Sequence, residues 1–221
     1  MKPRTRREFG FFTAATLLTS VRPRVAFGQA KARVVVIGGG IGGATAAKYL
    51  ASSAANIDVT LVEPRQIYTT CFFSNHYLAG LRAFESLNHS YEALTVHYGV
   101  TVVHETAETI DAQGKTVALT NGSKLAYDRL VVAPGIAFRD HALEGYDAAA
   151  MEIMPHAWNA GPQSELLRDQ LQSMEDGGLF VLVVPPSPIR CPPAPYERAS
   201  LIAELPKRRC AAVAAWLRVV E

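Results

Sequence analysis

The stretch RVVVIGGGIGG, from Arg33 to Gly43, decides the fold of this 221-residue chain. The segment that ends at Ile37 is apolar and rich in β-branched residues, which is typical of a buried parallel strand. Glycines then follow in the pattern G-x-G-x-x-G, and an alanine-rich helix is predicted from Ile41 to Ala51. A strand, a glycine turn and a helix in this order are the context in which the pattern binds a dinucleotide. A glycine-rich turn without a ligand is the alternative interpretation.

Each glycine of the motif has its own predicted role. Gly38 permits the tight turn, Gly40 lets the backbone approach the diphosphate, and Gly43 lets the helix pack closely on the strand. The helix that begins at Ile41 presents free N–H groups and a partial positive charge at its N-terminus. We therefore expect these residues to hold the diphosphate of the dinucleotide.

An acidic residue follows at the distance expected for ribose binding. Glu63 lies twenty residues after Gly43 and directly after a strand predicted over residues 58–62. Its carboxylate can accept hydrogen bonds from the ribose hydroxyls and repels a 2′-phosphate, so NADP is disfavoured. We count the next two residues, Pro64 and Arg65, together with Glu63 as cofactor-binding residues.

Strands and helices continue to alternate beyond Glu63. Strands are predicted over residues 100–104 and 130–133, a helix over 90–98, and a small antiparallel meander over 106–125. This order predicts an α/β fold with a doubly wound, Rossmann-like sheet.

A second unit begins after residue 150. An amphipathic helix over residues 164–174 precedes a buried strand over 179–184, and a helix over 196–205 follows a proline-rich loop. This order again opens a nucleotide-type fold, but one strand and one helix cannot cover both faces of a sheet. We therefore assign residues 31–150 to a dinucleotide-binding domain and residues 151–205 to an incomplete second nucleotide-type domain.

The final segment, residues 206–221, differs in composition from the rest. It is dominated by Arg, Ala and Val, and Pro206 interrupts a helix that is still amphipathic. We hypothesise that this tail is a frameshifted or truncated end, and a short terminal helix is the alternative. The frameshift hypothesis predicts a shifted continuation of the reading frame in the source DNA.

Composition gives no support for a nucleic-acid partner. Hydrophobic residues make up 49% of the chain and charged residues 19%, as in an ordinary globular protein. The formal net charge of +2 comes from the first thirty residues. Without them the chain has 16 basic against 19 acidic side chains, which leaves no excess of basic residues for phosphates.

The first thirty residues are typical of an export signal. The twin-arginine pattern Thr5-Arg6-Arg7-Glu8-Phe9 is followed by an apolar run that ends at Arg22 and is too short to span a bilayer. Small residues before Lys31 fit a cleavage site. We therefore predict a twin-arginine signal peptide over residues 1–30 and a periplasmic protein without a transmembrane segment. A basic amphipathic start on a cytosolic protein is the alternative.

Two features favour FAD over NAD as the dinucleotide. The fold begins at the expected mature N-terminus, and a second nucleotide-type fold starts inside the chain, as in flavoproteins with two dinucleotide domains. The segment from Tyr127 to Gly135 also resembles the strand and turn with which such flavoproteins return to FAD. Its last three residues, Ala133, Pro134 and Gly135, are therefore predicted to line the FAD site.

Several segments together resemble one family, the flavoprotein subunit of flavocytochrome c sulfide dehydrogenase. The resemblance extends from Lys31 to about Leu205 and is to the N-terminal half of the family's longer proteins. The last segment is specific, whereas the glycine motif is shared by many flavoproteins. The matching segments are Val34–Gly43, Cys71–Gly80, Tyr127–Gly135, Pro155–Trp158 and Arg190–Ala199.

The resemblance implies roles for two cysteines. In that family the cysteine matching Cys71 binds FAD covalently as a thioether, and the cysteine matching Cys191 forms half of a redox disulfide. From the residues alone, Cys71 has the alternative of a small buried hydrophobic residue. Cys191 lies outside regular structure, beside Arg190 and before a predicted helix, a setting that favours the reactive thiolate. The partner cysteine lies in the family's C-terminal half, and we do not transfer its role to Cys210.

The resemblance also implies an activity, in which hydrosulfide is oxidised and electrons pass through FAD to a c-type cytochrome subunit. No C-x-x-C-H motif occurs, so the haem belongs to another chain. The histidines show no paired metal-ligand spacing, and no metal site is predicted. The alternatives are a sulfide:quinone reductase-type flavoprotein and a non-catalytic truncated fragment of such an enzyme.

Overall fold

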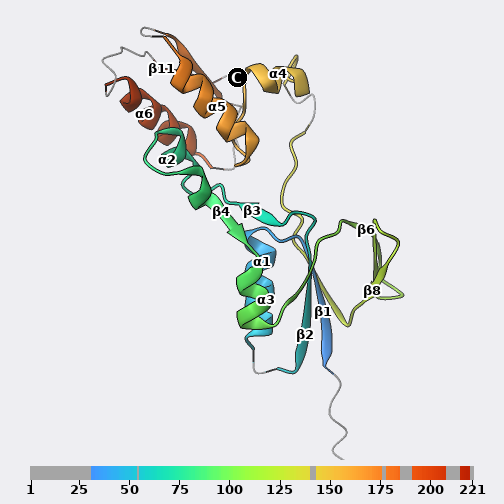
Figure 1. Cartoon of the computed structure of the whole chain (residues 1–221). Helices are drawn as coiled ribbons and strands as arrows, with labels where there is room; N and C mark the ends of the chain where they lie inside the picture. The colour runs from blue at the N-terminus through green and yellow to red at the C-terminus, as the bar shows by residue number, and fades with distance from the viewer. Residues whose placement is uncertain are drawn as a thin grey trace, which may run out of the picture. The chain divides into compact units, whose positions relative to one another are not determined.

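The computed structural model describes residues 31–53, 55–139, 143–175, 178–184, 191–207 and 215–219 (Figure 1). The predicted signal peptide, residues 1–30, lies outside the described residues, as do Arg190 and Cys210. The interpretations that depend on them therefore stay predictions.

A four-stranded parallel sheet forms the centre of the N-terminal part of the described chain, with strand order β5-β2-β1-β9. The central strand β1 is apolar throughout its second half, because it pairs on both sides and is covered on both faces. The predicted strands are confirmed within one or two residues. Their bounds are β1 Ala32–Ile37, β2 Ile57–Val62, β5 Thr101–Val103 and β9 Arg129–Val132.

Two different layers cover the faces of this sheet (Figure 1). Helices α1 (Ile41–Ala51) and α3 (Glu92–Tyr98) lie on one face, where Val34 and Val36 are buried against them. A three-stranded antiparallel sheet covers the other face, where Val35 is buried. The predicted meander is thus confirmed, as β6 (Ala107–Asp111), β7 (Thr116–Leu119) and β8 (Lys124–Ala126).

No sequence pattern predicted the elements between β2 and α3. A short antiparallel pair, β3 (Ile67–Thr69) and β4 (Asn88–Ser90), encloses the five-residue helix α2 (Ser74–Leu78) and the 3-10 helix η1 (Phe84–Leu87). Helix α3 therefore begins at Glu92, two residues later than the predicted helix.

The described part of residues 148–219 contains three helices and two strands. The division of the chain into two domains near residue 150 stays a prediction. Helix α5 begins at Pro162, because proline is favoured at the first helical position, where no N–H partner is needed. Helix α6 runs two residues past its predicted end at Leu205, and so includes Pro206. The elements are α4 Ala148–Ile153, α5 Pro162–Ser173, β10 Phe180–Val184, α6 Ala194–Lys207 and β11 Ala215–Val219.

Strand β11 lies within the tail and pairs in parallel with β10. Residues 215–219 are therefore a strand and not the short terminal helix that was the alternative. The frameshift hypothesis for the tail stays a prediction.

In the part of the chain that the structure describes, no helix is both long enough and apolar enough to cross a membrane.

Candidate functional site

The glycine turn after β1 is fixed by its backbone. Gly38 has a φ angle of +95°, a region that favours glycine, and its N–H donates to the Val62 carbonyl at 2.8 Å. A Cβ at Gly38 would lie 2.1 Å from the carbonyl oxygen of Ala133. The first glycine of the motif is therefore required by the turn and by the strand beside it.

Gly43 is required for a different reason. A Cβ at Gly43 would lie 1.8 Å from the carbonyl oxygen of Gly38, so the first turn of α1 packs directly on the glycine turn. Gly40 is less confined, because a Cβ there would meet only Tyr68 at 3.8 Å. No side chain caps α1 among the described residues, its first turn carries no acid, and Ile41 is 53% exposed. The backbone N–H groups in the first turn of α1 are thus open to an anion.

Glu63 lies at the end of β2 as predicted, but its carboxylate is engaged within the protein. It is buried and accepts a hydrogen bond from the Gly39 N–H at 2.7 Å and from Arg65 Nε at 2.8 Å. Burial alone would raise the pKa of Glu63, but the hydrogen bonds from Arg65 and from backbone N–H groups outweigh it and lower that pKa. The ionised carboxylate retains room for a further hydrogen bond.

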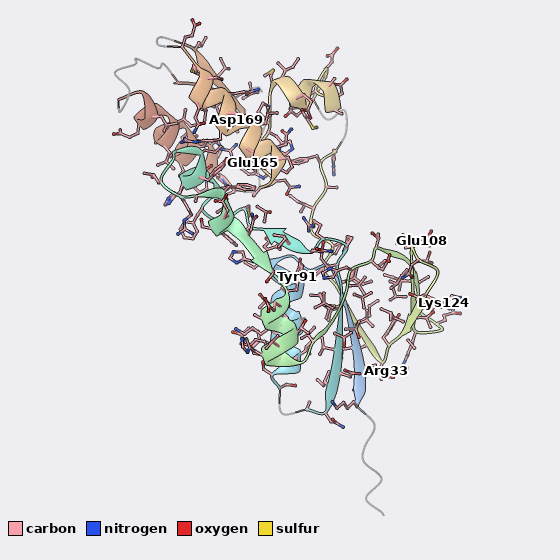
Figure 2. The ribbon with its side chains drawn as sticks, viewed as in Figure 1. Arg33, Tyr91, Glu108, Lys124, Glu165 and Asp169 are labelled. Carbon is pink, nitrogen blue, oxygen red and sulfur yellow. The ribbon has the colours of Figure 1, made fainter. Side chains whose placement is uncertain are left out.

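Tyr91, which sequence reasoning missed, closes the back of the glycine turn at the junction of β4 and α3 (Figure 2). Its buried hydroxyl donates to the Gly39 carbonyl at 3.0 Å. Burial, with the charge of Glu63 adding to it, raises the pKa of Tyr91 to about 12, so the phenol stays protonated as a donor. A tyrosine near the start of the helix predicted over residues 90–98 was the available signal, but it did not indicate the contact with Gly39.

The segment directly after β9, residues 133–135, contacts the glycine turn. The Ala133 N–H donates to the Ile37 carbonyl at 2.8 Å, and the Ala133 carbonyl faces Gly38. Pro134 and Gly135 follow as exposed residues, with Gly135 at a φ angle of +82°. The structure therefore brings Gly38, Gly43, Glu63 and Ala133 together at the carboxyl ends of parallel strands, where α/β sheets bind ligands. Pro64 is exposed beside them.

Cys71 lies in the turn between β3 and α2 as an exposed free thiol, not as a buried core residue. Its carbonyl accepts from the Ser74 N–H at 3.2 Å, and Phe73 adopts a φ angle of +65° directly before α2. A residue other than glycine rarely adopts this backbone conformation. The side chains of Phe72 and Phe73 are both more than half exposed.

Helix α2 is held by helices α5 and α6 from the later part of the chain. The Arg168 guanidinium on α5 donates to the Leu78 carbonyl, and Leu78 is buried in one cluster with Leu167. Tyr77 packs against this cluster. Burial first, and then the charges of Glu165 and Asp169 on α5, both labelled in Figure 2, raise the pKa of Tyr77.

Arg198 on α6 joins three segments. It is 6% exposed, and its Nε donates to Asn75 Oδ1 at 3.0 Å. Its two terminal nitrogens donate to the carbonyls of His156 and Ala157 at 2.9 Å and 2.7 Å. Arg198 and these partners together belong to three of the segments that carry the family resemblance, but the pattern alone did not show that they meet.

Cys191 is exposed, and its carbonyl accepts from the Ala194 N–H at 3.1 Å at the start of α6. Cys71 and Cys191 are both free thiols, so no disulfide joins them. Among the residues with described positions, no group of three or more His, Cys, Asp or Glu side chains forms a metal site.

Two protein families match the chain. The model for pyridine nucleotide-disulphide oxidoreductases matches residues 32–169. The model for the central part of the sulfide dehydrogenase [flavocytochrome c] flavoprotein chain matches residues 164–215, which include α5, β10 and α6.

Individual relatives agree with these matches. The sulfide dehydrogenase [flavocytochrome c] flavoprotein chain of Chlorobaculum thiosulfatiphilum is 60% identical over 43 residues, which are 20% of this chain and 90% of that relative. The sulfide-quinone reductase of Aquifex aeolicus (strain VF5) is 34% identical over 102 residues, which are 46% of this chain and 24% of that relative.

A solved structure extends the likeness to the fold. The sulfide:quinone oxidoreductase of Aquifex aeolicus superposes with a TM-score of 0.63 and 26% identity, covering 80% of this chain and 40% of that chain. This chain therefore spans less than half the length of the Aquifex relatives. The chain belongs to the pyridine nucleotide-disulphide oxidoreductases and to the family of the flavocytochrome c sulfide dehydrogenase flavoprotein chain.

Proposed function

We propose that this chain is the FAD-binding part of an exported sulfide-oxidising flavoprotein. In this proposal Cys71 tethers FAD as a thioether, Cys191 is one half of a redox disulfide, and a c-type cytochrome subunit receives the electrons. The observation that carries the proposal is that a glycine turn fit for a dinucleotide occurs in one chain with two exposed thiols at the starts of two contacting helices, α2 and α6.

The residues present fit FAD. The turn at Gly38 and Gly43 leaves no room for side chains, and the open N-terminus of α1 suits a diphosphate. Glu63 would bind the ribose hydroxyls, with Arg65 moving from its present hydrogen bond at 2.8 Å to admit them. When bound, FAD supplies the acceptor for the two electrons that sulfide gives up.

Exposure of both thiols supports their proposed roles. A thiol that reacts with a cofactor or a disulfide must be accessible, and Cys71 and Cys191 are both exposed. Hydrosulfide would attack the disulfide that contains Cys191, so that the S–S bond breaks, a persulfide forms on one cysteine, and the other leaves as a thiolate. A covalent tether through Cys71 would keep the cofactor from being lost outside the cell.

Location and partner are also proposals. The twin-arginine pattern at Arg6 and Arg7 supports export of the folded protein to the periplasm. The Chlorobaculum relative is the flavoprotein chain of a flavocytochrome c, which supports a cytochrome partner.

A sulfide:quinone reductase-type activity is the second candidate. It is favoured by the Aquifex relative, a sulfide-quinone reductase that is 34% identical over 102 residues. The two candidates differ in electron acceptor, so reduction of a c-type cytochrome or of a soluble quinone by sulfide separates them.

The test uses the protein produced in its own source. Addition of sulfide is expected to bleach the flavin absorbance, and Cys191→Ser is expected to abolish this bleaching while flavin content stays unchanged. Cys210→Ser is the matched control and is expected to keep the bleaching. Full bleaching in Cys191→Ser would overturn the role of Cys191, and absence of flavin from the wild-type protein would overturn the enzyme proposal.

A further inference from the structure

Arg198 is a buried cation whose partners are almost all neutral. Three of its nitrogens donate to Asn75 Oδ1 and to the carbonyls of His156 and Ala157. Burial lowers the pKa of Arg198 to about 10, while the neighbouring Glu197 raises it. A buried guanidinium is costly without hydrogen bonds, so the arrangement of these segments that supplies them is favoured.

Asn75 is the residue that connects this network to α2. Its Oδ1 accepts from Arg198 Nε at 3.0 Å, and its Nδ2 donates to Glu197 Oε2 at 2.8 Å. Both polar atoms of the amide therefore face α6. The other two bonds of Arg198 go to the carbonyls of His156 and Ala157, in the segment between α4 and α5.

The helices joined in this way carry the two exposed thiols at matching places. Cys71 lies three residues before α2, and Cys191 lies three residues before α6. In each case the cysteine carbonyl accepts from the N–H of the first helical residue, Ser74 or Ala194, at 3.2 Å and 3.1 Å. Each thiol therefore lies on a turn that is hydrogen-bonded to the first residue of the helix after it.

Helix α2 cannot fix its own position. It has five residues, far fewer than the ~12–15 that an isolated helix needs in water. Arg168 anchors its C-terminal end at Leu78, and Asn75 anchors the end that carries the thiol turn. Of these two contacts, the one at Asn75 is nearer to Cys71 along the chain, so its loss is expected to affect the thiol turn more.

We propose that Asn75, through Arg198 and Glu197, is a positioning residue that fixes the Cys71 turn relative to the Cys191 turn. The consequence for flavin chemistry rests on the proposed function of the two thiols, whereas the positioning itself does not. Loss of one hydrogen bond to a charged group is enough to change an equilibrium about tenfold, so the fixed arrangement would become a minor or mixed population without Asn75.

The test measures the distance between the two thiols by spin labels on Cys71 and Cys191, in the full chain with Cys210→Ser, reduced and prepared without FAD so that both thiols are free to react. Asn75→Ala is expected to broaden the distance distribution, because it cuts α2 from α6 and leaves the two carbonyl bonds of Arg198 intact. Asn88→Ala is the matched control, because Asn88 Oδ1 accepts a hydrogen bond from Thr69 Oγ1 at 2.8 Å within the neighbouring β3–β4 strand pair. An unchanged distribution in Asn75→Ala would overturn the proposal.

A rescue variant separates positioning from general damage. Asn75→Asp places a second carboxylate against Glu197 and is expected to broaden the distribution. Combining it with Glu197→Gln reverses donor and acceptor in the same hydrogen bond and is expected to restore the narrow distribution. Failure of the pair to restore it, in variants that melt as the wild type does, would contradict the proposal.

A second readout connects positioning to the flavin. In unlabelled protein, Asn75→Ala is expected to lower the covalently bound share of the flavin about tenfold while total flavin binding is unchanged. If wild-type protein holds no flavin, the proposed function fails, and the distance measurement still decides the positioning proposal. An unchanged covalent share together with an unchanged distance would refute both parts.

Discussion

The glycine turn from Gly38 to Gly43 and the segment from Cys71 to Leu78 are built in opposite ways. The glycine turn is fixed by backbone contacts with the strands on either side, such as Gly38 N–H to the Val62 carbonyl. Helix α2 is fixed by side chains about a hundred residues away, on α5 and α6. The glycine turn is therefore a property of the local fold, whereas the position of helix α2 depends on packing against α5 and α6.

Gly43→Val is expected to have the largest effect, by disrupting the glycine turn that backbone contacts fix. The new Cβ would lie 1.8 Å from the Gly38 carbonyl oxygen, and backbone cannot move aside cheaply. We expect a loss of about 3 kcal/mol of stability and loss of flavin binding, measured by chemical denaturation and by flavin titration. Gly42→Ala is the control, because nothing lies within 4 Å of a Cβ there. Equal losses in the two variants would contradict the packing argument.

Arg168→Met is expected to loosen helix α2, which side chains fix, and to leave the glycine turn unchanged. Removing the guanidinium leaves the Leu78 carbonyl without its donor, at a cost of about 1.5 kcal/mol. Hydrogen exchange is therefore expected to speed up at the amides of Ala79 and Gly80, which close the end of α2. Exchange in β1 and α1 should not change. Ser173→Ala is the control, because Ser173 is exposed at the end of α5 and its hydroxyl donates within the same helix. Faster exchange throughout the chain would contradict the separation of helix α2 from the glycine turn.

Glu63→Gln is expected to have the smallest effect and to show it mainly as a change in pH dependence. The pKa of Glu63 is lowered below its ordinary value of 4.5, so its stabilisation is present above pH 4.5 and is lost as the pH falls through the folded-state pKa. The substitution should lower the free energy of unfolding by about 1 kcal/mol at neutral pH. The stability of the variant should then depend less on pH in the acidic range. Denaturation midpoints from neutral to acidic pH measure it, and parallel pH profiles for wild type and variant would contradict the assignment.

The sequence predicted the sheet well, because the constraints there are local. Gly38 needs a positive φ angle, and Glu63 ends the adjacent strand, so spacing alone places both at one sheet edge. The alternation of Val34, Val35 and Val36 between two buried faces is likewise a property of one strand.

The remaining features could not be predicted, because they depend on pairs that no local pattern links. Arg198 meets Asn75 across 123 positions and His156 across 42. Tyr91 reaches Gly39 across 52 positions. A polar residue in a helix pattern indicates an exposed face by default, and only tertiary packing shows that Arg198 is buried.

The most direct test of the central claim is the mass of the peptide that contains Cys71, taken from protein isolated from its own source. The account predicts that this peptide carries the added mass of FAD and absorbs light as a flavin. An unmodified Cys71 peptide, from a protein whose flavin is released on denaturation or is absent, would contradict it.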